Sequence, residues 1–256
     1  MSRTARMWLL GLGLIGVGVC YALAALDLPS FGSTFHPYRD MAVPAAVAHG
    51  AANAVTSIVF DQRGLDTLVE EIILFGSVIG AVALLRPSRE EQEHGPSPMG
   101  RVLEPTRLLG YVMLPTTLVI GVDVVTHGHL TPGGGFQGGV ILATGLHLLY
   151  VAGSYQALDR LRPVALFEHG EAIGAAGFAI LGIAGILTSA AYLTNMLSYG
   201  TLGQMFSAGT VPILNAIVGV EVASGVIVLL ARFFDQAVLL GHQRESISVP
   251  QPGELR

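Results

Sequence analysis

The sequence is poor in charged and in reactive side chains. Only 12% of its 256 residues are charged, whereas an ordinary soluble domain has about 25%. It has no lysine, so all 13 basic residues are arginine, and the formal net charge of −5 argues against nucleic acid as a partner. The single cysteine, Cys20, excludes an internal disulfide bond and a thiolate metal cluster.

Long apolar runs make up most of the chain. Hydrophobic residues account for 52% of it, and the mean hydropathy is +0.62. A helix that crosses a bilayer needs about 20 predominantly apolar residues, so we predict an all-α, polytopic membrane protein with about seven transmembrane helices, three followed by four. The expected spans are residues 7–26, 42–60, 65–85, 108–125, 136–152, 173–192 and 213–230. The second is interrupted by Pro44, His49 and Asn53, and the alternative is that it crosses only half of the membrane.

One long hydrophilic segment, residues 86–105, predicts a domain boundary because it is rich in arginine, glutamate, proline and glycine. The predicted parts are a three-helix membrane module at 1–88, a linker at 89–104, a four-helix domain at 105–240 and a polar tail at 241–256. Arginines cluster in the linker, after the fifth span and near the C-terminus, so these regions are expected on the cytoplasmic side of the cell membrane. The uncharged segment 193–211 is expected to lie in the membrane interface or to re-enter the membrane.

A glycine-rich stretch lies between the fourth and fifth apolar runs. Its structural residues are Pro132, Gly133, Gly134, Gly135, Phe136, Gln137, Gly138 and Gly139. It is not a phosphate loop, because no Gly-Lys-Ser/Thr follows. The proline ends the preceding element, the glycines free the backbone, and the last two give the next helix a smooth packing surface. The favoured interpretation is a rigid helix–loop–helix corner.

The histidines beside this stretch, His127 and His129, raise the alternative of a metal site. Imidazole is a common ligand, but two ligands one residue apart need a third to make a site. We therefore predict no metal. No nucleophile–base–orienter set occurs either, so we expect neither an enzyme nor a bound cofactor.

The most informative ionisable residue is Glu221, about 12 Å deep in the last predicted span at 1.5 Å per residue. An ionisable side chain at that depth costs about 2.5–3.5 kcal/mol on insertion scales, so it has to face protein or water. One interpretation is a protonatable relay or an ion ligand. The other is a neutral glutamic acid hydrogen-bonded to a neighbouring helix.

Acidic residues also open the third predicted span. Glu70 and Glu71 lie at the membrane margin, and Asp66 shares a helix face with Glu70. A role in ion passage is one hypothesis for these carboxylates. The structural alternative is a capping box, formed by Thr67 and Glu70, together with an ion pair from Arg63.

Four weaker candidates complete the set. Asp123 and His127, one turn apart, could hold a proton between them, or could simply be solvated at the interface. His49 and Asn53 are expected to mark one polar face of the second span. His147 is interpreted as a packing residue, and the acidic cluster at Glu168, His169 and Glu171 is expected to be solvated at the mouth of the sixth span.

Two motifs resemble known families. Residues 105–152, with Gly128 to Gly139 at their centre, resemble the MnhB/MrpB subunit family of multisubunit cation/proton antiporters, and the resemblance extends over about residues 101–240. The stretch from Asp61 to Glu70 matches Asp-x-Arg-Gly-x-Asp-Thr-x-x-Glu, which resembles the C-terminal segment of the large antiporter subunit, the E-type small subunit of membrane-bound hydrogenases. Leu65 and Glu71 depart from that pattern, and Glu71 leaves open which carboxylate would carry the family's role.

The resemblance implies a membrane subunit of a Mrp-type Na⁺/H⁺ antiporter, with Na⁺ and H⁺ as transported ions and other membrane subunits and the bilayer as partners. It also allows membership of an energy-converting, hydrogenase-type redox complex. A purely structural docking subunit is the alternative that involves no titrating group. If the chain is part of an antiporter, Glu70, Asp66 and Glu221 are expected to line or border an ion path.

Overall fold

The computed structural model describes residues 3–28, 32, 34–85, 102–152, 164–189 and 191–248. All the regular secondary structure in these residues is helical, which confirms the all-α prediction for them. They belong to two compact units, Met1–Met41 and Ala42–Arg256, and each is described by itself. The predicted linker lies almost wholly outside the described residues, so the predicted domain division there stays a prediction.

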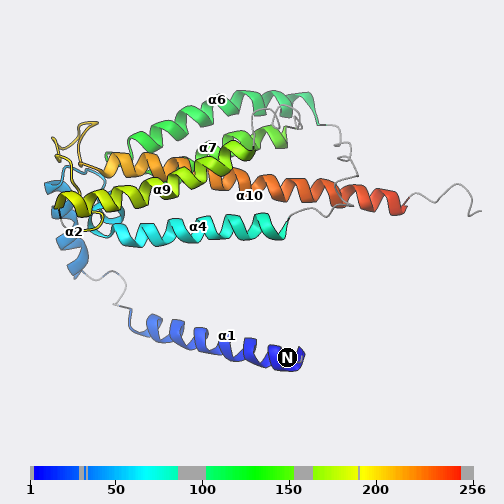
Figure 1. Ribbon diagram of the computed structural model, residues 1–256, viewed down its shortest axis with the longest axis horizontal. Helices are drawn as coiled ribbons and strands as arrows, with labels where there is room; N and C mark the ends of the chain where they lie inside the picture. The colour runs from blue at the N-terminus through cyan, green and yellow to red at the C-terminus, as the bar shows by residue number, and fades with distance from the viewer. Residues whose placement is uncertain are drawn as a thin grey trace, which may run out of the picture. The chain divides into compact units, whose positions relative to one another are not determined.

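The first unit contains α1 (Arg3–Leu26), which is drawn in blue in Figure 1. Its 24 residues would extend over about 36 Å, enough to cross a bilayer. The side chains from Leu12 to Leu26 are exposed within the unit, and Cys20 is among them. Lipid or protein outside this unit therefore has to cover the helix.

The second predicted span, residues 42–60, is wrong as a single helix. α2 (Pro37–Ala48) ends next to Gly50, whose φ of +77° leaves the right-handed region and whose Cβ, if present, would overlap the carbonyl oxygen of Tyr199. Asn53 then caps α3 (Ala54–Ser57) by accepting from two backbone N–H groups. A short π-helix, η1 (Ile58–Gln62), completes this broken segment.

Five long helices form the rest of the second unit and run side by side (Figure 1). They are α4 (Gly64–Leu84), α6 (Glu104–Thr126), α7 (Gly135–Val151), α9 (Val164–Ser189) and α10 (Val211–Ser248). Four of them contain segments long and apolar enough to cross a membrane, while α7 is shorter. The predicted spans agree with these helices except at two ends: α9 begins nine residues before residue 173, and α10 continues beyond residue 230.

α10 is the central helix, packed against α7, α9 and α4. In the most apolar stretch of Val211–Phe233, 61% of the residues are buried, compared with 17–22% in the corresponding stretches of the other three candidate spans. Glycines allow this close approach. A Cβ at Gly135 or Gly139 of α7 would collide with the backbone of α10 near Gly219, and a Cβ at Gly174 of α9 would lie 2.5 Å from Cβ of Glu221.

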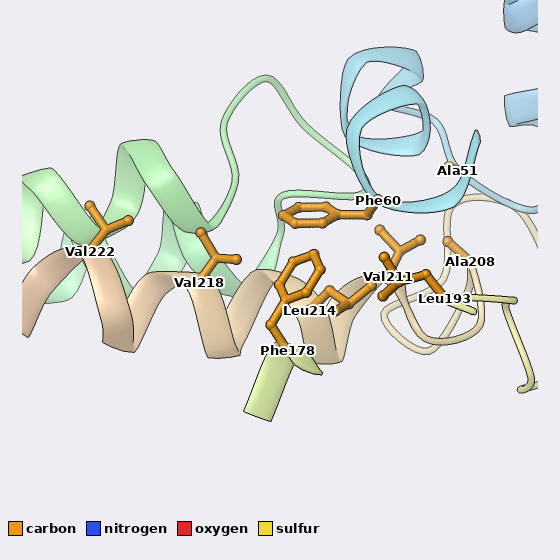
Figure 2. Close-up of a cluster of buried hydrophobic side chains, with 9 residues drawn as sticks. All are labelled: Ala51, Phe60, Phe178, Leu193, Ala208, Val211, Leu214, Val218 and Val222. Atoms are coloured by element: carbon orange, nitrogen blue, oxygen red, sulfur yellow. The ribbon is translucent and has the colours of Figure 1, made fainter. Parts of the chain in front are cut away.

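A hydrophobic cluster holds the N-terminal end of α10 in place (Figure 2). The rings of Phe60 and Phe178 lie 6.3 Å apart, centroid to centroid, and Leu214 and Val218 pack beside them. The cluster consists of Ala51, Phe60, Phe178, Leu193, Ala208, Val211, Leu214, Val218 and Val222. It therefore joins the broken α2–η1 segment to the uncharged segment 193–211 and to two long helices.

The contacts between α9 and α10 predict that position 174 does not tolerate a large side chain. Replacement of Gly174 by leucine should destabilise the second unit by about 1–3 kcal/mol or more, because overpacking forces the helix backbones apart. Gly76→Leu on α4 is the control, since nothing lies within 4 Å of a Cβ there. The measurement is thermal unfolding of each purified variant in mild detergent; equal melting temperatures would contradict the packing described here.

Candidate functional site

Three glutamates from three different helices are buried together in the interior of the bundle. Glu71 of α4, Glu171 of α9 and Glu221 of α10 are 1%, 4% and 0% exposed. Among the described residues, the carboxyl groups of Glu71 and Glu221 have no hydrogen-bond partner other than each other, and Oε1 of Glu171 has none. Glu71 and Glu221 lie close enough to interact electrostatically, as do Glu171 and Glu221. We refer to these three residues as the carboxylate cluster.

Glycines determine how the carboxylate cluster is assembled. Gly174 of α9 lies against the Cα and Cβ of Glu221, and Gly170, one turn away, lies against the hydroxyl of Ser224. On α10, a Cβ at Gly225 would come 3.2 Å from Oε1 of Glu171. A larger residue at this position would therefore crowd the carboxyl group of Glu171.

The cluster lies deep in the predicted membrane region. Glu221 is ten residues from Val211 and twelve from Phe233, or about 15 Å and about 18 Å along the helix. Burial of unpaired carboxylates at this depth is costly. The carboxyl groups of this site are therefore stable when they bind a proton, when two of them share a proton, or when a cation lies next to an ionised carboxylate.

The structure separates the two neighbouring acids at the start of α4. Glu70 is exposed and lines a cavity of about 340 Å³, whereas Glu71 points into the bundle. Asp66 is also exposed and pairs with Arg63 at 2.5 Å, which is the ion pair expected for that arginine. The predicted capping box is wrong, because α4 begins at Gly64 and the Thr67 hydroxyl donates instead to the carbonyl of Val59 at 2.6 Å.

The prediction that Glu171 is solvated at the mouth of a span is also wrong. Because α9 begins at Val164, Glu171 lies two turns inside the helix and faces α10. Glu168 and His169 are exposed, as expected for solvated residues, and Glu168 accepts a hydrogen bond from Arg232 at 3.1 Å. Neither the burial of Glu171 nor its proximity to Glu221 was anticipated from the sequence.

The glycine-rich stretch forms a corner fixed by side chains from two other segments. The Asn53 amide donates to the carbonyl oxygens of Gly128 and Thr131 at 2.8 and 2.9 Å, and the Thr56 hydroxyl donates to Gly128 at 2.7 Å. The Gly135 N–H donates to the side-chain oxygen of Asn215 at 2.8 Å. These contacts give the motif a structural role, and the corner walls the cavity that Glu70 lines.

The two histidines of this region have different surroundings. His127 pairs with Asp123 at 3.0 Å and is half-buried, whereas the His129 ring is fully buried. Burial lowers the pKa of His129, although the nearby backbone of Gln204 and Met205 acts in the opposite direction. Among the described residues, no three histidine, cysteine, aspartate or glutamate side chains are grouped as a metal ion would require.

A second polar network, around Asp61, lies at the loop end of the bundle. His49 Nδ1 lies 2.5 Å from Asp61 Oδ2, and the Asn195 amide donates to Asp61 Oδ1 at 3.1 Å. Asn195 in turn accepts from the N–H and the hydroxyl of Thr210, and the His49 ring stacks on Tyr199 with centroids 4.3 Å apart. Burial raises the pKa of Tyr199, and the Asp61 charge adds to this effect.

This network corrects the prediction for His49. His49 and Asn53 do not share a helix face, because the chain leaves the helix between them at Gly50. The sequence singled out His49 but missed Asp61 and Asn195 as its neighbours. Asp61 was available within the acidic motif, whereas nothing local marked Asn195, which lies 134 residues away from Asp61.

The buried His129 predicts a pH dependence of stability. A histidine whose folded-state pKa is lowered from its usual 6.5 binds its proton mainly in the unfolded state. Stability should therefore be retained above about pH 7 and decline as the pH falls through about 6.5. His129→Gln should flatten this part of the curve measured by thermal unfolding, whereas replacement of the exposed His36 by glutamine should leave it unchanged; an unaltered curve for His129→Gln would refute the assignment.

Comparison with known proteins gives a matching family and similar sequences. Residues 105–228 match the family described as a domain related to the MnhB subunit of Na⁺/H⁺ antiporter. An uncharacterized protein of Methanocaldococcus jannaschii is 30% identical over 199 residues, or 68% of this chain and 73% of that protein. A protein of Rhizobium meliloti, described as a probable K⁺/H⁺ antiporter subunit, is 26% identical over 192 residues, or 66% of this chain but only 18% of that protein.

Two solved structures are similar over 91% of this chain. A chain of the membrane-bound sulfane sulfur reductase, an archaeal respiratory membrane complex, has a TM-score of 0.69 and 27% identity, with 98% of that chain covered. A chain of the Mrp complex from Dietzia sp. shares the fold with a TM-score of 0.64 and 20% identity, with 26% of that chain covered.

Proposed function

Because this chain belongs to the family with a domain related to the MnhB subunit of Na⁺/H⁺ antiporters, we propose that it takes part in the ion exchange of such an antiporter through its buried glutamates. It is a multi-pass membrane protein and acts as one membrane subunit of a multisubunit cation/proton antiporter. Its function is transport, and we assign it no catalytic reaction.

The observation that carries the proposal is the pair formed by Glu71 and Glu221, two buried carboxyl groups that have no hydrogen-bond partner among the described residues other than each other. In a region of low dielectric constant, a carboxyl group is stable when it is protonated or when a cation lies beside it. Protons and cations therefore compete for the same group. Such competition is the elementary requirement for exchanging one ion for the other.

The transported cation is a monovalent metal ion, Na⁺ or K⁺. The family description refers to Na⁺/H⁺ exchange, and the Rhizobium meliloti relative is described as belonging to a probable K⁺/H⁺ antiporter. Both similar structures come from multisubunit membrane complexes, which supports other membrane subunits as partners. The exposed apolar faces of α4, α6 and α9 provide the surfaces that these partners and the lipid would cover.

A second candidate is membership of a redox-driven membrane complex. The observation that favours it is the likeness to a chain of an archaeal respiratory complex, of which 98% is covered at 27% identity. In that case electron transfer in other subunits would drive the ion movement. The role of the carboxylate cluster within this chain would be the same.

The central experiment is neutralisation of the two glutamates. Glu71→Gln and Glu221→Gln should each lower cation/proton exchange by the assembled complex at least about tenfold, because the amide cannot bind or release a proton. Exchange is measured in membrane vesicles by the dequenching of a pH-sensitive dye on cation addition. Glu104→Gln is the control, since Glu104 is exposed at the start of α6. Full activity of both variants in an intact complex would establish the purely structural docking role instead.

The partners distinguish the two complexes. A tagged chain purified in mild detergent should recover large antiporter-like membrane subunits together with small membrane companions. Iron–sulfur or nickel subunits identified by mass spectrometry would assign the chain to a redox-driven complex. Recovery of the chain alone, stable and monodisperse, would contradict both assignments.

A further inference from the structure

A groove of about 600 Å³ lies between α4, α9 and α10, toward the end of the bundle at which α9 begins. One wall is apolar and is formed by α4 side chains such as Phe75 and Val82. The opposite wall carries Glu168, Glu171 and Arg232. The groove is separate from the cavity that Glu70 lines, which is walled by the glycine-rich corner.

The charged wall indicates what fills the groove. Oε1 of Glu171 has no hydrogen-bond partner among the described residues, and the same is true of the buried Nε of Arg232. Arg232 uses its Nη2 to donate to Glu168, which is partly exposed. A lipid acyl chain offers these groups nothing, whereas water satisfies both. At about 30 Å³ per water molecule, the groove has room for several waters.

Glu171 connects this groove to the deeper acids. Its Oε1 lies over Gly225, which is one turn from Glu221 along α10, or about 6 Å. Glu221 in turn interacts with Glu71. The acids therefore descend in steps, from the groove through Glu171 to Glu221 and Glu71.

We propose that the groove is the water-filled route by which protons reach the carboxylate cluster from one side of the membrane, with Glu171 as its inner end. This inference rests on the proposed function. A hydronium ion in the groove gives its proton to the Glu171 carboxylate and leaves water. Glu171 then passes that proton to the Glu221 carboxylate, directly or through one water, and becomes ionised again.

The groups around Glu171 assign the roles along this route. Glu221 of α10 faces it from the inner side, with Glu71 of α4 next to Glu221, and Glu168 and Arg232 lie toward the open groove. The Glu168–Arg232 ion pair stands on the charged wall, where its two charges largely compensate each other. Glu171 is therefore the only carboxylate of the cluster that also lines the groove.

The first test measures water access and needs no transport. In a Cys20→Ser background, which removes the chain's only cysteine, Ala172→Cys places a thiol on the groove wall. Ile173→Cys is the matched control at the same depth on α9, because Ile173 is 68% exposed and does not line the groove. A charged, membrane-impermeant thiosulfonate should modify Ala172→Cys in the assembled complex roughly tenfold faster, since a thiol needs water to ionise and react.

The control reagent is a lipid-soluble maleimide, which should modify both cysteines. Equal thiosulfonate rates at the two positions would overturn the inference, because the groove would then be no wetter than the outer face of α9. Modification of neither would also overturn it, by showing that lipid or protein fills the groove. Because labelling is read out without transport, its failure is distinct from a failure of the proposed function.

The second test concerns Glu171 itself. Glu171→Gln should lower exchange about 100-fold, the scale of a positioned proton-transfer group, and Glu171→Asp should restore part of it with an altered pH profile. His169→Gln, on the exposed side of α9, is the control. Glu171→Gln with normal exchange, while Glu221→Gln is inactive, would overturn the proton route and leave the proposed function standing. Equal loss in Glu171→Gln and Glu171→Asp, with an unchanged pH profile, would reduce Glu171 to a packing role.

Discussion

The close approach of helix backbones along α10 is the constraint on which the rest of the structure depends. Glycines on α7 and α9 meet α10 where any side chain would collide. In a membrane, where apolar side chains gain little by leaving lipid, such contacts are a main source of helix association. The same contacts decide which groups meet, because Gly174 and Gly225 leave space for Glu221 and Glu171.

The helical class and most of the long helices could be predicted from the sequence, because apolar runs of spanning length carry that information locally. The broken segment between Pro37 and Gln62 could not. It is apolar enough to resemble a span, and its interruption depends on the approach of Tyr199 to Gly50. Such a contact between distant residues leaves no periodic signal.

The candidate site likewise contains residues that could be predicted from the sequence and residues that could not. Glu221 is identifiable from the sequence because a carboxylate at mid-span is conspicuous by itself. The motif that ends at Glu70 makes the sequence favour Glu70, whereas the structure buries Glu71. Two adjacent residues of a helix cannot be assigned to the inner or the outer face without knowledge of the neighbouring helices. It places Glu171 at the mouth of a span because α9 begins earlier than its hydrophobic run does. In each case the missing information is the position of another helix.

The length of α7 has a consequence for the surrounding bilayer. Its 17 residues extend over about 26 Å, whereas the hydrocarbon region is about 30 Å thick. This hydrophobic mismatch requires the bilayer to thin beside α7 or another subunit to cover its ends. The N-terminal end of α7 belongs to the glycine-rich corner that walls the cavity of Glu70. Thinning at that end brings the aqueous phase closer to the acids at the start of α4, so a deficit of about one helical turn shortens the dry distance that an ion has to cross.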